Sequence, residues 1–309
     1  MIETQGLTKY YGQTPALMDL DLRIEEQDIF GFIGPNGAGK TTTMRILATL
    51  LEPTSGSATV DGLDVGRHGK EIRRRVGYMP DFMGVYDDLK VFEYLEFFAA
   101  AFDIPRKKRK ALVDGVLELT DLDGKRAAAV DSLSRGMQQR LQIARVLIHD
   151  PKVLILDEPA SGLDPRARIE IRELLRELKR MGKTIMISSH ILSELSEICD
   201  RVAIIEQGRL VFSGTLDDIR RRMGLHSKFR VQVDPDRQDD AIGVLSALPQ
   251  VSDVQSKQTY LSVTLTDGVK DEGLIARVLV GKDIGLRALV PEELKLDEAF
   301  LQLTTGAVQ

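Results

Sequence analysis

The hydrophobic pattern of the chain changes from alternation to continuous apolar runs. Residues 18–24 alternate strictly between apolar and charged side chains, which predicts an antiparallel strand with one face in water. Three short runs are predominantly apolar. They are residues 29–33 and 153–156, and residues 184–188, where three apolar residues lie between Thr184 and Ser188. Such runs predict strands buried on both faces, as in the interior of an α/β sheet.

Helical patterns lie between these runs. A helix is predicted over residues 40–51, and most of residues 71–130 are predicted to be helical. Residues 134–149 carry an apolar stripe at helical spacing. Asp164 is a good N-cap and Gly182 a good C-terminal stop, which predicts a helix between them. Strands that alternate with helices predict a doubly wound α/β core.

A different pattern follows residues 201–213, which are predicted to form a hairpin. From residue 225 the expected order is strand, helix, two strands, helix and strand. These segments are residues 229–233, 239–248, 251–266, 271–279 and 286–290. The order is that of a small α+β ferredoxin-like sandwich. We therefore predict two domains, residues 1–224 and 225–309, with a last helix over residues 296–303.

Composition limits the classes of function that the chain can have. The net charge of −5 argues against a nucleic-acid-binding protein that works by bulk electrostatics. The only cysteine, Cys199, excludes an internal disulfide and a cysteine-based zinc cluster. We expect no signal peptide, no lipid anchor and no membrane-spanning segment. If the protein acts in transport, another chain must supply the pore.

A glycine-rich loop follows the first buried run. Residues 34–41 read Gly-Pro-Asn-Gly-Ala-Gly-Lys-Thr and fit the motif G-x-x-x-x-G-K-[ST]. The glycines allow backbone N–H groups to turn inward on phosphate oxygens, Lys40 adds a charge, and the next helix offers its positive end. A chance glycine-rich turn is the simpler alternative, but the flanking strand and helix favour the phosphate loop. The expected nucleotide-binding residues are Gly34, Pro35, Asn36, Gly37, Ala38, Gly39, Lys40, Thr41 and Thr42.

The second buried run ends in two acids. Asp157 is expected to hold Mg²⁺ through water, together with Thr41, and Glu158 to polarise the attacking water as general base. Alone, such a strand end is usually just solvated. Beside the phosphate loop, it predicts a site for a nucleoside triphosphate and Mg²⁺. A phosphate loop alone does not distinguish kinases, GTPases and transport ATPases.

Residues 133–140 indicate which class of phosphate-loop protein the chain resembles. Their sequence, Leu-Ser-Arg-Gly-Met-Gln-Gln-Arg, resembles the signature motif of ATP-binding-cassette (ABC) proteins, and residues 2–220 look like such a cassette. The resemblance implies a P-loop NTPase fold with a RecA-like core, an antiparallel β subdomain and a helical subdomain over about residues 82–150. It also implies that two cassettes form a dimer with ATP between them.

Further residues follow the order of the family. Tyr11 resembles the aromatic residue that stacks on adenine, Asp164 the D-loop aspartate, and His190 the switch histidine. Taken singly, Tyr11 could be an exposed strand residue and His190 a helix cap. The residues that the resemblance places against the ATP of the opposite cassette are Ser134, Arg135 and Gly136.

Two positions depart from the family pattern. Asp81 stands where most members carry a glutamine that touches Mg²⁺ and water, so Asp81 joins the expected metal ligands with an added negative charge. Arg135 replaces the usual glycine of the signature, while Ser134 and Gly136 are kept. We interpret Arg135 as tolerated, or as pairing across the dimer.

Aromatic residues gather in one region. Eight of the 16 aromatic residues lie between residues 78 and 102, where cassettes of transporters receive a coupling helix from the membrane subunit. The simpler alternative is that they form the core of the helical subdomain. The basic run at residues 106–110 is interpreted as a solvated helix start, with contact to anionic lipid as the alternative.

The tail indicates the subfamily. Residues 296–304, Leu-Asp-Glu-Ala-Phe-Leu-Gln-Leu-Thr, resemble the closing helix of cassettes that serve exporters of drugs, polysaccharides and lipids. We therefore predict an ATP-hydrolysing subunit, a homodimer on the cytoplasmic face of the membrane, that drives a separate integral membrane permease. An importer subunit with a regulatory tail and a soluble ATPase acting on ribosomes or nucleic acid are the alternatives. The cargo is not predicted, because its contacts lie on the permease.

Overall fold

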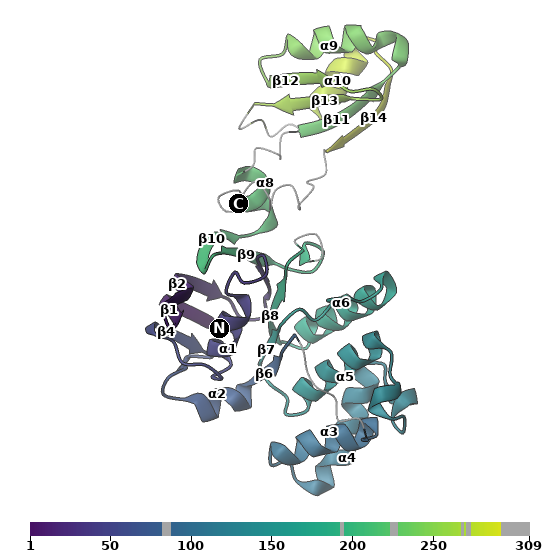
Figure 1. Cartoon of the computed structure of the whole chain (residues 1–309). Helices are drawn as coiled ribbons and strands as arrows, with labels where there is room; N and C mark the ends of the chain where they lie inside the picture. Colours follow the sequence, from purple (N-terminus) through teal and green to yellow (C-terminus); the bar gives the residue numbers. More distant parts are fainter. Residues whose placement is uncertain (82–87, 192–194, 223–227, 267–268, 270–272, 292–309) are drawn as a thin grey trace. The chain divides into compact units, whose positions relative to one another are not determined.

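The computed structural model describes residues 1–81, 88–191, 195–222, 228–266, 269 and 273–291. The chain forms two compact units that divide between Gly214 and Thr215 (Figure 1). The sequence placed the domain boundary ten residues later, between residues 224 and 225. Among the described residues, no helix has both the length and the apolar composition needed to cross a membrane.

A six-stranded sheet forms the centre of the first unit, in the order β10-β9-β3-β8-β7-β6. Its strands are β3 (Ile29–Ile33), β6 (Val76–Met79), β7 (Val153–Leu156), β8 (Thr184–Ser189), β9 (Arg201–Glu206) and β10 (Arg209–Gly214). All neighbouring strands are parallel except the β9–β10 hairpin. Every residue of β3, β7 and β8 is buried, as predicted from the sequence, including the polar Thr184, Ser188 and Ser189 of β8.

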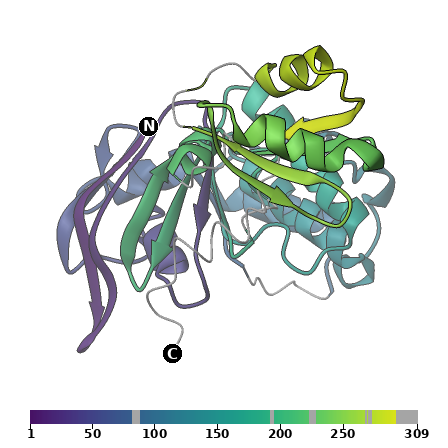
Figure 2. The ribbon, with the colours of Figure 1, turned by 90° about the horizontal axis from the view of Figure 1, so that it is seen from above.

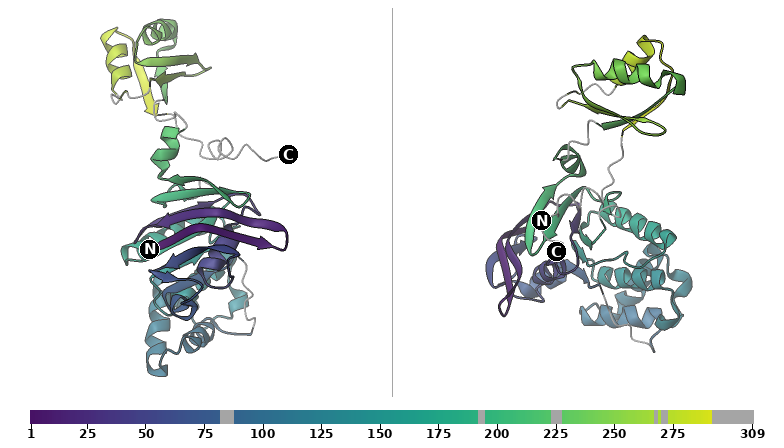
Figure 3. Two further views of the ribbon diagram at one scale, coloured as in Figure 1. Left: turned by 90° about the vertical axis from the view of Figure 1, so that its left-hand side faces the viewer. Right: turned by 45° about the horizontal axis from the view of Figure 1, so that its top comes forward.

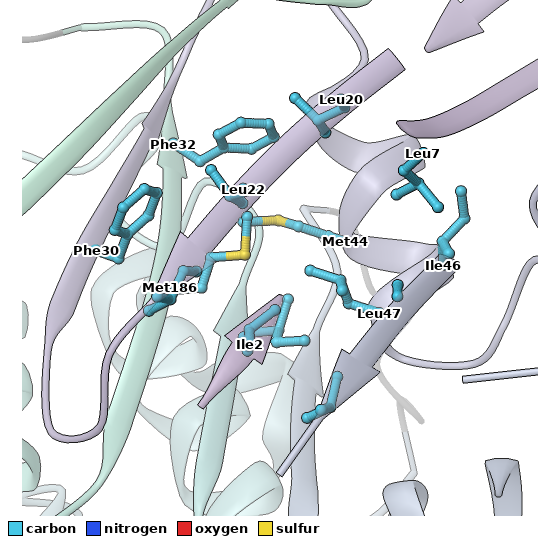
Figure 4. Close-up of a cluster of buried hydrophobic side chains, with 14 of the residues drawn as sticks. Ile2, Leu7, Leu20, Leu22, Phe30, Phe32, Met44, Ile46, Leu47 and Met186 are labelled. Carbon is cyan, nitrogen blue, oxygen red and sulfur yellow. The ribbon is translucent and has the colours of Figure 1, made fainter. Parts of the chain in front are cut away.

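A second, antiparallel sheet has the order β2-β1-β4-β5. It contains β1 (Ile2–Tyr11), β2 (Thr14–Ile24), β4 (Ser55–Val60) and β5 (Leu63–Asp64). Figure 4 shows the apolar cluster that joins this sheet to the central one through α1 (Lys40–Leu47). Leu20 comes from β2, Phe32 from β3 and Met44 from α1, and all three are fully buried. This packing fixes the start of α1, and with it the phosphate loop.

Helix α2 (Gly69–Arg75) packs beside β5 and β6. The helical part of the first unit contains α3 (Val91–Ala101), α4 (Arg106–Leu119) and α5 (Arg135–Leu147), with short turns η1 (Asp123–Lys125) and η2 (Val130–Ser132), and α6 (Pro165–Arg180) follows β7. Helices α3, α4 and α5 pack on one another (Figure 1).

Most of residues 71–130 are helical, as predicted, but they also include β6, a central-sheet strand whose four residues are too few to show a period. The helix predicted over residues 40–51 was wrong in extent. The helix from Lys40 ends at Leu47 instead of continuing to residue 51, because Thr49 adopts a left-handed backbone, with φ of 60°.

The second unit is an antiparallel sheet covered by two helices. It comprises β11 (Lys228–Val233), η4 (Pro235–Arg237), α9 (Gln238–Ser246), β12 (Val251–Ser256), β13 (Leu261–Leu265), α10 (Leu274–Gly281) and β14 (Leu286–Pro291), after α8 (Leu216–Arg222). The sheet order is β12-β13-β11-β14, with every pair antiparallel. Both α9 and α10 lie on the same face of the sheet (Figures 2 and 3). The helix predicted over residues 296–303 lies outside the described residues.

Candidate nucleotide site

The phosphate loop is the turn between β3 and α1. Gly37 and Gly39 adopt positive φ angles of 81° and 107°, which glycine tolerates best. A Cβ at Gly34 would collide with the carbonyl oxygen of Ile205, so this position also requires glycine. Gly39 is the N-cap residue of α1 and makes no side-chain hydrogen bond, so the N-cap supplies no acceptor to the first backbone N–H groups of the helix. Such a helix start suits a phosphate group.

The other predicted loop residues surround this turn. Pro35 accepts a hydrogen bond from the Ala38 N–H at 3.1 Å, and Ala38 is buried. Asn36 is exposed, and Thr42 is half-buried in the first turn of α1. The sequence therefore identified a real structural unit, a tight turn that ends on a helix N-terminus.

Lys40 is buried inside this loop, with 6% of its surface exposed. Its Nζ donates hydrogen bonds to the carbonyl oxygens of Gly34 at 2.6 Å and Pro35 at 3.3 Å. Burial lowers the pKa of Lys40, and the carboxylates of Glu158 and Asp157 oppose that shift. Nζ lies 3.7 Å from Glu158 Oε1, so the lysine charge is balanced by the acidic end of β7. A triphosphate would offer the ammonium group a stronger anionic partner.

Asp157 directly follows β7 and accepts two side-chain hydrogen bonds. It is 1% exposed, its Oδ2 accepts a hydrogen bond from Thr41 Oγ1 at 2.6 Å, and its Oδ1 accepts one from Ser188 Oγ at 2.5 Å. Mg²⁺ prefers oxygen ligands and usually keeps several waters and substrate phosphates in its shell. The adjacent hydroxyl and carboxylate of Thr41 and Asp157 fit that donor set.

Glu158 and His190, the two residues predicted to be catalytic, lie within hydrogen-bond distance of each other. His190 Nδ1 lies 3.2 Å and 3.1 Å from the two carboxylate oxygens of Glu158. The Glu158 side chain is 11% exposed, whereas that of His190 is 44% exposed. Glu158 has a φ of 52°, a left-handed backbone that non-glycine residues rarely adopt. The loop therefore holds this carboxylate in a strained position beside an accessible histidine, a common property of functional sites.

Ser188 is the residue that sequence analysis missed. It is fully buried at the end of β8, where its Oγ donates to Asp157 and accepts the N–H of Glu158 at 2.9 Å. One hydroxyl thus joins the side chain of one acid to the backbone of the next. The available signal was a buried polar residue at the end of an apolar run, immediately before Ser189 and His190.

Tyr11 is the last residue of β1, and Asp81 lies two residues beyond the end of β6. Tyr11 is 49% exposed, and Lys9 Nζ lies 5.6 Å from its ring centroid. This exposure leaves a ring face available for stacking. Asp81 is exposed, and its negative charge opposes the lowering of the pKa of Lys40 as a minor cause. Asp81 is therefore within electrostatic reach of the phosphate loop.

The signature segment forms a separate cavity of about 180 Å³. Ser134 caps α5 and accepts the Met137 N–H at 3.4 Å. The guanidinium of Arg135 lies against Gly162, where any Cβ would collide with it. Asp164 caps α6 by accepting the Ala167 N–H at 3.0 Å. Gly136 lines the same cavity, whose lining includes no residue of the phosphate loop. The signature cavity and the phosphate loop thus share no lining residue.

Comparison with known proteins identifies the class. The ABC transporter family model matches residues 17–161. The bacitracin transport ATP-binding protein BcrA of Bacillus licheniformis is 35% identical over 307 residues, which cover 99% of this chain and 98% of the relative. This chain belongs to the ABC transporter family. The cassette is accordingly an ATP-binding ATPase subunit, which confirms the family and the enzymatic activity predicted from sequence.

Two other relatives also extend over almost the full length of the cassette. The Nod factor export ATP-binding protein I of Cupriavidus pinatubonensis is 35% identical and covers 98% of this chain and 90% of its own length. The daunorubicin resistance ATP-binding protein DrrA3 of Streptomyces coeruleorubidus is 34% identical and covers 98% and 95%. Their names agree with the exporter prediction and favour neither of its alternatives.

Solved structures support the cassette fold. An ATP-binding subunit of an ABC transporter superposes with a TM-score of 0.66 at 31% identity, covering 73% of this chain and 94% of its own. A dimeric bacterial ABC transporter cassette gives a TM-score of 0.63 at 25% identity, covering 70% and 99%. The α/β cassette fold predicted from the sequence is confirmed.

Proposed function

We propose that this cassette hydrolyses ATP in order to drive an exporter whose membrane permease is a separate chain. The observation that supports this most directly is the connected network at the strand ends, in which Lys40, Asp157 and Glu158 meet Ser188 and His190. It places a cation for phosphate, a carboxylate for metal and a candidate general base within one site.

Each side chain then has a distinct task. The phosphate loop and Lys40 bind the phosphates of ATP, and Thr41 with Asp157 holds Mg²⁺, which when bound neutralises negative charge on the phosphates. Glu158 orients the attacking water and accepts its proton as the water oxygen bonds to the γ-phosphorus and ADP leaves. His190 Nδ1 fixes the carboxylate of Glu158 toward that water. Tyr11 stacks on adenine, and Asp81 contributes charge beside the metal.

A second copy of the chain completes the site. Ser134 lies at the N-terminus of α5 and lines a cavity that shares no residue with the phosphate loop, which supports a site that two copies complete. We propose a two-fold homodimer in which α5 of one copy aims its N-terminus at the γ-phosphate bound by the other. ATP binding then closes the dimer, and hydrolysis removes the charge that held it closed.

A groove of about 320 Å³ is our proposed docking site for the permease. Phe98 and Phe102 from the end of α3 line it, together with Tyr78, Arg145 and residues of the adjoining elements. The Phe102 ring stacks on His149 at 3.9 Å and stays 37% exposed, whereas Tyr94 on the same helix is fully buried. Some aromatic residues of this region are thus buried in the core, and others line the groove. A polar-rimmed apolar groove suits a short amphipathic helix.

The proposal is tested by co-expression with a candidate permease. Phe102→Ala should release the cassette from the membrane fraction and keep basal ATP hydrolysis within a few fold, because the nucleotide site is built from other segments. Phe97→Ala is the matched control, an exposed aromatic of the same helix that does not line the groove. Loss of both activities in Phe102→Ala would show that the ring is needed for folding. Phe82 and Tyr86, expected at the same surface, lie outside the described residues.

We also propose that the second unit is a ferredoxin-like sandwich. Its strand order β12-β13-β11-β14 and its antiparallel pairs support this assignment.

A further inference from the structure

Helix α4 begins with five consecutive cations, Arg106, Lys107, Lys108, Arg109 and Lys110, called here the α4 basic turn. All except Arg109 are exposed. The half-buried Arg109 donates from Nε to the carbonyl oxygen of Ile104 at 2.7 Å, so its stem is fixed against the preceding loop. The turn therefore presents four cationic side chains to solvent on a rigid base.

This position is unfavourable for the helix itself. The N-terminus of a helix carries partial positive charge, so cations there are destabilising. No acid occupies the first turn of α4, and its N-cap is Pro105, which makes no side-chain capping bond. Arg106 and Lys110 also face each other as like charges four residues apart. Helix stability does not explain the α4 basic turn.

Internal ion pairs do not explain it either. Within the described part of the chain, no ion pair includes Arg106, Lys107, Lys108 or Lys110. By contrast, cations along α6 have acidic partners. These pairs are Arg166 with Glu170, Arg172 with Glu197, Arg176 with Glu173, Lys179 with Asp200, and Arg180 with Glu177. In a chain of net charge −5, acids are plentiful, so the α4 basic turn is a local concentration of uncompensated positive charge.

The chemistry of the partner follows from this charge. Three of the five cations are lysines, which carry compact charges on flexible stems and fit a diffuse anionic layer better than a fixed bidentate acceptor. Clusters of four to eight basic residues beside a membrane attract anionic lipid headgroups. Phe102, four residues before Arg106, lines the groove proposed for the permease. Docking there would bring the α4 basic turn toward the bilayer.

We propose that the α4 basic turn binds the anionic lipid surface of the membrane. Its location beside the bilayer rests on the proposed permease groove, whereas the charge argument stands without it. The contact would orient the cassette at the membrane and add to the attachment that the permease provides.

Vesicle flotation with the purified full-length chain tests this proposal. The chain is mixed with vesicles of phosphatidylcholine alone, or with about one third phosphatidylglycerol, at low salt. We expect flotation only with the anionic vesicles and release as salt screens the charges. Each basic residue should contribute about fivefold to partitioning, so Lys107→Gln with Lys108→Gln and Lys110→Gln should weaken binding roughly a hundredfold.

A matched triple variant controls for net charge. Lys125→Gln, Lys257→Gln and Lys282→Gln remove three exposed lysines elsewhere and should leave vesicle binding nearly unchanged. Thermal unfolding separates binding from folding, because neutralising the start of α4 should keep or raise its midpoint. A lower midpoint would assign the lysines a structural role and overturn the proposal.

Two other outcomes would also contradict it. Equal loss in both triple variants would mean that net charge alone drives binding. The wild type could fail to bind anionic vesicles while its α4 lysines are still required for binding to the permease in neutral detergent. That result would assign the α4 basic turn to an acidic protein segment instead of lipid. The vesicle assay contains no permease, so its failure leaves the proposed exporter function intact.

Discussion

Removal of the Ser188 hydroxyl should weaken Mg²⁺ binding more than ATP binding. The hydroxyl is fully buried, donates to Asp157 Oδ1 at 2.5 Å and accepts the Glu158 N–H at 2.9 Å. In Ser188→Ala, the carboxylate loses its fixed orientation and a buried N–H loses its acceptor. An orphaned buried donor costs about 1–3 kcal/mol of stability, and loss of a residue that orients a metal ligand typically costs about 10–100-fold in metal affinity.

The assay is a Mg²⁺ titration of the binding of a fluorescent ATP analogue. The Mg²⁺ concentration at half-saturation should rise about 10–100-fold in Ser188→Ala, while binding without metal stays close to wild type. Ser188→Thr keeps a hydroxyl and should recover much of the loss. Ser189→Ala is the neighbouring control, since its hydroxyl accepts the Ile191 N–H. An unchanged Mg²⁺ midpoint in folded Ser188→Ala, or the same shift in Ser189→Ala, would refute the role of Ser188.

Three further predictions concern binding and pH. MgATP at about 100 times its Kd should stabilise the wild type by about 2.7 kcal/mol, and thermal shift should show much less for Lys40→Ala; equal shifts would argue against the phosphate loop. Asp81→Asn should raise the Mg²⁺ concentration for half-maximal hydrolysis, and an unchanged value would place Asp81 away from the metal. Burial lowers the pKa of His149 in the folded protein below its usual 6.5. As the pH falls below 6.5, His149 is therefore protonated in the unfolded chain before it is protonated in the folded protein. The free energy of unfolding should therefore fall as pH drops through 6.5 toward the lower folded-state pKa, and His149→Gln should reduce this slope; identical slopes would contradict it.

The parts of the fold that could be predicted are those with a strong local period. The buried strands β3 and β7 have uninterrupted apolar runs and β8 has three successive apolar residues, and all three strands were predicted almost residue for residue. Strand β6 has four residues, and β1 has register shifts that interrupt its alternation, so neither produces a clear pattern. Their pairing depends on partners far away in the chain.

The same limit applies to the site. Lys40, Asp157 and Glu158 were found because phosphate and metal chemistry demands fixed residue types at fixed offsets. Ser188 was missed because its role depends on sheet order: β8 lies between β3 and β7, so the end of β8 falls between the phosphate loop and the acids. The contact of Arg135 with Gly162 likewise depends on loop geometry.

The central claim, ATP hydrolysis by Glu158 within a cassette dimer, is tested most directly in Glu158→Gln. This change keeps the shape of the side chain and removes the base, which typically costs about 10²–10⁴ in rate. With MgATP, the variant should bind nucleotide and accumulate as a dimer in size-exclusion chromatography, while turnover falls by that factor. Near-normal turnover, or a variant that binds ATP and stays monomeric, would contradict the account.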